Sequence, residues 1–294
     1  MAKISDLLAR GRTYSFEFFP PKNDTEQGRL VQTLFDLQPL RPSFVSVTYR
    51  GGPPSRQRTT DVVVSMLRLT TLNPMAHLTC AGHDRLELAD ILVSFRKAGI
   101  ENLMALAGDP VGGPPAPGGE LAHALDLVEL ARAIGGFCIG VAAHPAGHPR
   151  SRSMAADRRF LARKLRSADF AITQFFFEAS DYFALVDDLA ARGVTKPVLP
   201  GIMPVGSLTS VPRMAEMGCA VPAWLVERLQ GAYARGGPEA VTKAGIDAAT
   251  ELCRELLDKG VPGLHFYTLN RSEATRQIHV NLGLTGGPGS GARS

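Results

Sequence analysis

The chain has 294 residues, of which 45% are hydrophobic and 20% charged, a balance typical of a globular protein with a substantial core. Its formal net charge of +4 is mild and its basic residues are mostly scattered, which argues against nucleic acid as a partner. No segment is apolar and long enough to span a bilayer, residues 1–12 lack the apolar stretch of a signal peptide, and the four cysteines form no CxxC pair. We therefore expect a cytoplasmic protein without membrane contact.

Short β-rich runs recur along the chain, with helical patterns between them. The runs occupy residues 14–19, 44–49, 75–80, 102–106, 137–143, 170–176, 198–203 and 264–269. The intervening helices show one apolar face, as in the i, i+3, i+4, i+7 spacing of Leu88, Ile91, Leu92 and Phe95. Strands that alternate with helices are parallel, and eight such units close most naturally into a (β/α)8 barrel of the TIM type.

The region between the seventh and eighth expected strands has room for extra helices, over residues 207–217, 222–234 and 238–259. We expect one catalytic barrel domain over residues 1–284, because no earlier stretch has the composition of a linker. Residues 285–294 have nothing to bury and are expected to be disordered. A doubly wound open sheet is the alternative, which EFFPPKN in place of GxGxxG after the first strand disfavours.

Polar residues fall repeatedly in or just after the expected strands, where barrels of this kind carry their active sites. They are Glu17, Thr48, Tyr49, His77, Thr79, Asp109, His144, His148, Gln174, Asn270 and Arg271. A structural role explains any one of them more easily than it explains the whole ring. The ring therefore indicates a functional site at the C-terminal mouth of the barrel.

Glu17 is the strongest candidate for catalysis. Strand alternation puts Ser15 and Glu17 on one face and Phe16 and Phe18 on the other, which is the better face for packing on helices. Glu17 would then point into the barrel mouth, where aromatic neighbours would desolvate it, raise its pKa and let it hold a proton near neutral pH. A carboxylate paired with a basic residue is the structural alternative.

The other candidates are more ambiguous. Asp109, in ALAGDP, could equally cap a turn. Gln174, an uncharged amide in an apolar strand, suits recognition of a heterocycle edge, with a satisfied core amide as the alternative. His77, His144 and His148 lack the spacing of a metal site, and we expect no metal. A basic run within residues 150–166 could face phosphate or carboxylate groups, or form a solvated helix face.

Six motifs, in order, resemble the signature of the methylenetetrahydrofolate reductase family. They are SFEFFPPK at 15–22, FVSVTY at 44–49, HLTC at 77–80, AITQFFF at 171–177, PGIMPV at 200–205 and HFYTLNR at 265–271. The resemblance runs from about residue 13 to residue 284 and is to the short bacterial form. It implies a barrel that passes hydride from NADH or NADPH to FAD, and then to 5,10-methylenetetrahydrofolate to give 5-methyltetrahydrofolate. It also implies a homo-oligomer.

The same resemblance assigns roles to individual residues. Glu17 resembles the general acid that protonates folate N10 and opens the five-membered ring. Asp109 resembles the carboxylate that binds the pterin and tunes the flavin, Gln174 the amide that reads the pterin, and Arg271 a residue that meets the glutamate tail. The positions that match FAD contacts are Thr48, His77, Leu106, Gly108, Asp109, His148, Asp157 and Lys164.

The chain departs from the family pattern at five positions of the implied sites. The family usually has Arg in place of Ala107, Gly in place of Arg50, and aromatic residues in place of His123, His144 and Leu208. Ala107 removes a guanidinium expected on FAD, which Arg50 could supply instead, so we expect FAD to bind weakly. Leu208 removes a ring expected to stack on the folate.

Three alternative functions stay open at this point. Hydride could pass directly from the nicotinamide to the folate without flavin. The chain could instead be a folate-binding or flavin-binding relative without turnover. An unrelated barrel, such as a Schiff-base lyase, is disfavoured because no expected strand carries an inward lysine.

Overall fold

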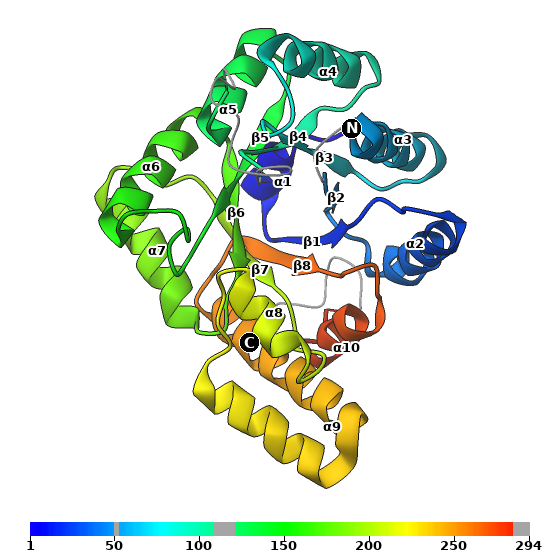
Figure 1. The fold of residues 1–294 in the computed structure, drawn as a ribbon, viewed down its shortest axis with the longest axis vertical. Coiled ribbons are helices and arrows are strands. Elements are labelled where there is room, and N and C mark those ends of the chain that lie inside the picture. Colours follow the sequence, from blue (N-terminus) through cyan, green and yellow to red (C-terminus); the bar gives the residue numbers. More distant parts are fainter. Residues whose placement is uncertain (50–52, 109–120, 285–294) are drawn as a thin grey trace.

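The computed structural model describes residues 1–49, 53–108 and 121–284, with the backbone alone for residues 53–56. Its strands form a closed parallel barrel in chain order, and β8 closes on β1 (Figure 1). They are β1 Thr13–Phe18, β2 Phe44–Val47, β3 Pro74–Thr79, β4 Asn102–Leu106, β5 Cys138–Ala143, β6 Phe170–Phe175, β7 Val198–Ile202 and β8 Gly263–Tyr267. The predicted (β/α)8 barrel is confirmed, and each expected run contains or overlaps a strand. The expected C-terminal tail lies outside the described residues.

Helices surround the barrel and bury their apolar faces against the outward side chains of the strands. They are α2 Asp24–Leu37, α3 Pro53–Leu69, α4 Arg85–Lys97, α5 Ala124–Ile134, α6 Met154–Ser167, α7 Ala179–Ala191 and α10 Glu273–Asn281, with a short 3-10 turn η1 Gln38–Leu40. In α4, Leu88 and Leu92 are fully buried, as their spacing predicts. Asp84 and Glu87 form a capping box that fixes where α4 begins.

The N-terminal helix α1, Ile4–Arg10, closes the end of the barrel opposite the strand C-termini. Ile4 is fully buried and joins an interior cluster with Phe44 and Phe170. Its backbone N–H donates to Asn102 Oδ1 over 3.0 Å. This plug was not predicted from the sequence, and it leaves the opposite mouth as the accessible end of the barrel.

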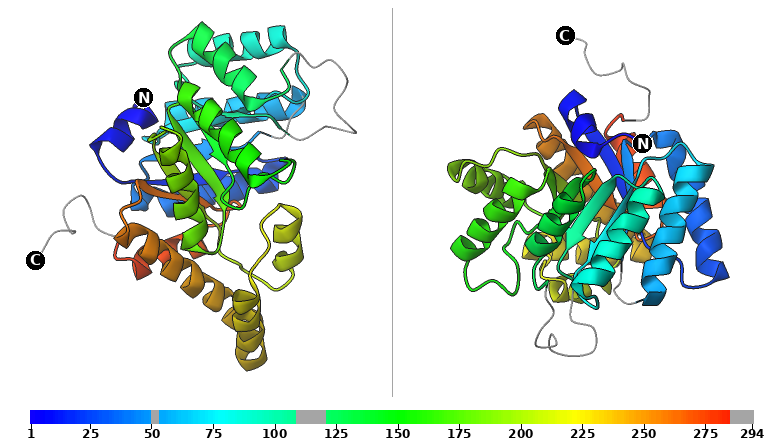
Figure 2. Two further views of the ribbon diagram at one scale, coloured as in Figure 1. Left: turned by 90° about the vertical axis from the view of Figure 1, so that its left-hand side faces the viewer. Right: turned by 90° about the horizontal axis from the view of Figure 1, so that it is seen from above.

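The insertion between β7 and β8 consists of α8, Ser210–Glu216, and α9, Ala223–Asp258. The backbone of α9 is non-helical at Gly236 and Gly237, so the element is two helices in a hairpin, as predicted. Arg228 and Glu251 join the two arms through hydrogen bonds of 2.7 and 2.8 Å. The hairpin projects from the barrel, and Figure 2 shows α8 on the side opposite α1. Across the described residues, no helix is long and apolar enough to cross a membrane.

Candidate active site

The centre of the mouth is built from β1 and β8, whose inward residues stand in register. Ser15 pairs with His265, and Glu17 pairs with Tyr267. Phe16, between them, is fully buried in the core between strands and helices. Strand alternation therefore placed the Glu17 side chain correctly on the inner face.

The Glu17 carboxylate is held by side chains from three other strands. Its Oε2 accepts a 3.3 Å hydrogen bond from Ser46 Oγ of β2 and lies 3.4 Å from the Nε2 atoms of His77 and His265. His265 is completely buried, and its Nδ1 lies 2.8 Å from Ser15 Oγ. Because the Glu17 side chain keeps 12% of its surface exposed, this network ends in one carboxylate that is open to the mouth.

The expected rise in the pKa of Glu17 is wrong. Burial is the largest influence and raises the pKa, but the hydrogen bond from His265, the attraction of the carboxylate to the imidazoles of His77 and His265 when they are protonated, and the Ser46 hydroxyl together lower it below its usual value. Among the inward neighbours of Glu17, His77, His265 and Ser46 offer polar or chargeable groups that offset its burial. Glu17 is therefore an ionised carboxylate at neutral pH.

His77 differs from His265 in its bonding. Its Nε2 is buried and makes no hydrogen bond within the described part of the chain, because the 3.4 Å approach to Glu17 lacks hydrogen-bonding geometry. Burial lowers the pKa of His77 more strongly than the Glu17 charge raises it, so the ring is neutral at pH 7. His77 therefore presents a buried ring nitrogen without a partner beside the carboxylate.

Across the mouth from Glu17, the pairing of β6 with β7 shifts register between Ile172 and Phe175. In this break the Oγ1 of Thr173 accepts the Gly201 N–H over 2.8 Å, and its carbonyl accepts the Tyr267 hydroxyl over 2.7 Å. Gln174 follows and is partly exposed, with its Oε1 accepting the Phe175 N–H over 3.1 Å. Its Nε2 makes no hydrogen bond with a described residue, so its donors are available to a ligand.

Predicted cofactor residues line the ends of β2 and β4. The Thr48 hydroxyl oxygen, just past β2, is buried and makes no hydrogen bond with any of the described residues. Leu106 is the last residue of β4, and Gly108 follows it with φ of +80°. A Cβ on Gly108 would lie 2.8 Å from Ala81 and 2.9 Å from Thr79, so only glycine fits this close approach.

The predicted cofactor residues near β5 form hydrogen bonds and an ion pair with neighbouring protein groups. Asp157 Oδ1 accepts the His148 N–H over 3.1 Å, and Oδ2 pairs with Arg158 over 2.9 Å. Lys164 Nζ donates to the Ala142 carbonyl over 2.7 Å. Burial lowers the pKa of Lys164 to about 8, which leaves it mostly protonated at neutral pH. These residues brace the loop between β5 and α6, and their predicted contact with FAD stays a prediction.

The basic run divides into buried and exposed parts. Arg158 is buried, and it donates to the carbonyls of His144 and Pro145 over 2.8 and 2.6 Å. Arg159 and Arg163 are exposed on α6. The ring of His144 lies 4.7 Å from that of His148, and burial lowers the pKa of His144 to about 4. His144 is therefore a neutral ring where the family has an aromatic one.

Other predicted residues are peripheral or lie outside the described residues. Asp109 and Arg50 fall in the undescribed segments, so their predicted roles stay predictions. Arg271 is exposed and follows Leu269 and Asn270, whose φ values are +52° and +55°. No cluster of three or more His, Cys, Asp or Glu in the described part of the chain could hold a metal ion.

Sequence reasoning missed Ser46, His265 and Tyr267 as individual site residues. A usable signal was present, because alternation along residues 263–267 puts His265 and Tyr267 on one face of the last strand. The register that brings them beside Glu17 could not be read from this signal.

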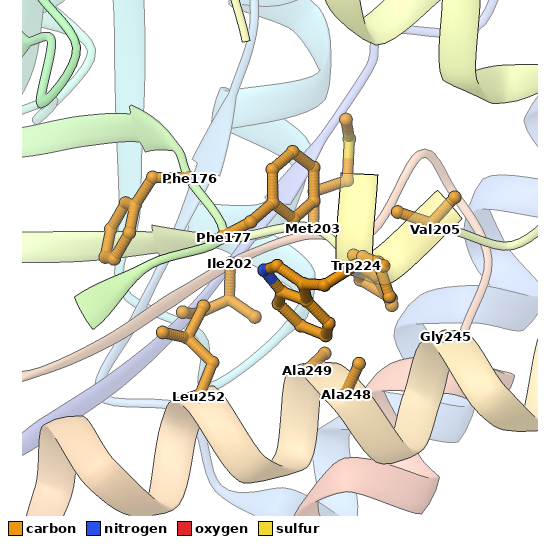
Figure 3. A pocket seen from close by; sticks show the side chains of 12 residues that line it. Phe176, Phe177, Ile202, Met203, Val205, Trp224, Gly245, Ala248, Ala249 and Leu252 are labelled. Atoms are coloured by element: carbon orange, nitrogen blue, oxygen red, sulfur yellow. The ribbon is translucent and has the colours of Figure 1, made fainter. Parts of the chain in front are cut away.

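A separate apolar pocket lies between the ends of β6 and β7 and helix α9 (Figure 3). Its lining includes Phe177, Met203 and Trp224, and it carries no ionisable side chain. A Cβ on Gly245 would lie 2.0 Å from the Val205 carbonyl oxygen, so α9 packs directly on the loop after β7. The pocket lies where the hairpin packs on the barrel, and none of its lining side chains is acidic or basic.

Fold and mouth together define a (β/α)8 barrel with its ionisable centre at the strand C-termini. The family model for methylenetetrahydrofolate reductase matches residues 3–283. The chain is 36% identical over 273 residues to the 5,10-methylenetetrahydrofolate reductase of Pectobacterium carotovorum subsp. carotovorum, covering 92% of this chain and 90% of that protein. This chain belongs to the methylenetetrahydrofolate reductase family, whose named members are oxidoreductases.

Two further comparisons extend this result. The probable methylenetetrahydrofolate reductase (NADH) of Oryza sativa subsp. japonica is 33% identical over 299 residues, which cover 96% of this chain and 50% of the plant protein. A Clostridium thermocellum protein that binds two copies of 5-methyl-5,6,7,8-tetrahydrofolic acid superposes with a TM-score of 0.63, covering 97% of this chain and 99% of its own. At 13% identity, that likeness shows the shared fold.

Proposed function

We propose that this protein reduces 5,10-methylenetetrahydrofolate to 5-methyltetrahydrofolate, with hydride taken from NADH or NADPH by way of FAD. The observation that carries the proposal is the Glu17 carboxylate at the barrel mouth, bonded to His265 and Ser46 and still partly open. Opening the imidazolidine ring of the substrate needs a proton at a nitrogen, and a positioned carboxyl group can supply it. The names of the bacterial relatives support the same reaction.

Glu17 must gain a proton before it can act as this acid, because its lowered pKa leaves it ionised at neutral pH. Burial already acts to raise its pKa, and a folate over the mouth would remove the remaining solvent and strengthen that influence. His265 bridges Ser15 and Glu17, so it is placed to pass a proton to the carboxylate or to stabilise the charge left after donation. Ser46 holds the same oxygen in place.

Gln174 supplies the second part of the substrate site. Its Nε2 donors are available at the end of β6, where they suit the acceptors on a pterin edge. Arg271 is exposed at the end of β8 and fits the carboxylates of the glutamate tail. Asp109 is proposed to bind the pterin on the strength of the motif match alone.

The described residues fit a bound flavin at the ends of β2 to β5. The buried Thr48 hydroxyl oxygen lacks a partner, a state that costs free energy and that a ligand atom would relieve. Thr48, His77, Leu106, Gly108 and His148 would hold the cofactor, with Asp157 and Lys164 bracing the adjoining loop. FAD, when bound, supplies a two-electron acceptor and donor between the nicotinamide and the folate.

One observation favours a second candidate, direct hydride transfer from the nicotinamide to the folate. Ala107 offers no guanidinium at a position where the family usually has one, so the chain has lost one anchor for FAD. We further propose a cytoplasmic location, small-molecule substrates and a homo-oligomer, as the family resemblance implies.

The two candidates differ in whether flavin is reduced and reoxidised. The test mixes the purified protein with FAD under anaerobic conditions and follows flavin absorbance while NADH or NADPH, and then methylenetetrahydrofolate, is added. The proposal expects the absorbance to fall with the nicotinamide and to return with the folate. An absorbance that falls but does not return would contradict the proposed substrate.

A further inference from the structure

Tyr267 makes an unusual connection within the barrel. It belongs to β8, yet its hydroxyl donates over 2.7 Å to the carbonyl of Thr173 on β6, with β7 between the two strands. The ring crosses β7 at Gly201, where a Cβ would lie 2.6 Å from Tyr267 Cε2 and 2.2 Å from the Thr173 oxygen. Glycine at this position therefore makes the connection possible.

The Tyr267 hydrogen bond takes the place of a backbone hydrogen bond that is lost where β6 and β7 change register. Because β6 and β7 lose their pairing here, side chains satisfy the backbone instead: Tyr267 bonds the Thr173 carbonyl, and Thr173 Oγ1 bonds the Gly201 N–H. The Thr173 carbonyl and the N–H of Gln174 belong to one planar peptide unit. Fixing that carbonyl therefore fixes the direction in which the chain enters Gln174.

Tyr267 also stands next to the proposed acid. It is the register partner of Glu17, and its ring packs edge-on against His265 at 5.2 Å and Phe175 at 6.3 Å. Burial, and then the charge of Glu17, raise the pKa of Tyr267 well above its usual value, so the phenol keeps the proton that it donates. The ring is thus held by packing, and its hydroxyl by the hydrogen bond to the Thr173 carbonyl.

We infer that Tyr267 is a positioning residue for the folate, which acts through Thr173 to hold the Gln174 amide at a fixed place relative to Glu17. The inference rests on the proposed function, because it assumes that Gln174 reads the pterin. Tyr267→Phe keeps the ring and its packing and removes only the hydroxyl. The variant should therefore make the position of the Gln174 amide less fixed while keeping the packing around the site.

The test is a double-mutant cycle on the FAD-loaded protein, with affinity for folic acid measured by calorimetry. Folic acid carries the pterin edge but no reactive methylene group. Loss of one hydrogen bond that orders a binding residue should weaken folic acid binding about five- to tenfold in Tyr267→Phe. In a Gln174→Ala background the same change should cost less than about twofold, because the residue through which Tyr267 acts is gone.

The chain offers a matched control in Tyr182. Its hydroxyl also donates over 2.7 Å to a strand carbonyl, that of Val198, but from α7 on the outside of the barrel. Tyr182→Phe should lower the melting temperature about as much as Tyr267→Phe and leave folic acid affinity unchanged.

The outcomes separate the inference from the function on which it rests. Equal losses of affinity from Tyr267→Phe with and without Gln174 would overturn the inference alone, as would wild-type affinity in Tyr267→Phe. If the wild-type protein bound no folic acid, the proposed substrate site would fall and the inference with it.

Discussion

Replacing Glu17 with glutamine tests the proposed acid most selectively. Glutamine has nearly the same shape, and its side-chain oxygen can still accept the Ser46 hydroxyl and the His265 N–H that now hold Oε2. It cannot donate an acidic proton. Hydride transfer from the nicotinamide to flavin involves no folate nitrogen, so only the reduction of folate should fail.

The expected size of the effect follows from what the variant removes. The contacts at Oε2 are 3.3 to 3.4 Å long, so their weakening should cost little, whereas a general acid contributes a factor of about 10² to 10⁴. Folate reduction should therefore slow by about that factor, which is about 3 to 5 kcal/mol in activation free energy. Flavin reduction should change less than about threefold.

The assay reduces the FAD-loaded variant anaerobically, adds methylenetetrahydrofolate and follows flavin reoxidation. Glu178→Gln is a matched control, because Glu178 is a carboxylate just after β6 that bonds Trp224 and lies outside the Glu17 network. It should leave both half-reactions intact. Reoxidation of Glu17→Gln at the wild-type rate would show that Glu17 is structural and would refute the reasoning.

Three further predictions follow from particular residues. Ala107→Arg should increase the FAD retained through gel filtration, because it restores a guanidinium; unchanged or lower retention would contradict that interpretation. Gly201→Ala should lower the free energy of unfolding in urea by about 2 kcal/mol or more, since the new methyl group would overlap the Thr173 carbonyl; wild-type stability would show that the strand can yield. Protonation of His144, whose pKa falls from 6.5 to about 4 on burial, favours the unfolded chain between those values. The free energy of unfolding should therefore decrease as pH falls from 6.5 towards 4, by on the order of 1 kcal/mol per pH unit. Urea titrations at pH 7 and pH 5 should show a smaller loss of unfolding free energy in His144→Phe than in the wild-type protein; equal losses would exclude His144 as a cause.

The fold was predictable because the strand runs, the helical periodicity and the positions of the turns all indicated the same architecture. The apolar strand runs, the one-sided helices and the Gly236–Gly237 break all matched the observed elements. Period-two alternation also placed Glu17 on the inner face. Helix α1 was missed because seven residues give too little periodicity, and its role as a plug depends on contacts such as that with Asn102, far along the chain.

The surroundings of Glu17 could not be predicted from the sequence. Ser46, His77 and His265 reach Glu17 from other strands, and His265 lies 248 residues away in the sequence. Their approach depends on the shear of the closed barrel, which no local pattern encodes. The predicted sign of the Glu17 pKa shift was wrong for this reason: the sequence neighbours are apolar rings, whereas His77, His265 and Ser46 approach the carboxylate in space and lower its pKa.

We propose that this chain makes 5-methyltetrahydrofolate and needs flavin to do so. The most direct measurement is chromatographic detection of 5-methyltetrahydrofolate after anaerobic incubation with methylenetetrahydrofolate and NADH or NADPH, with and without added FAD, on protein stripped of cofactor. The account predicts product only when FAD is present. Equal product without FAD would contradict the flavin linkage, and no product under either condition would contradict the proposed reaction itself.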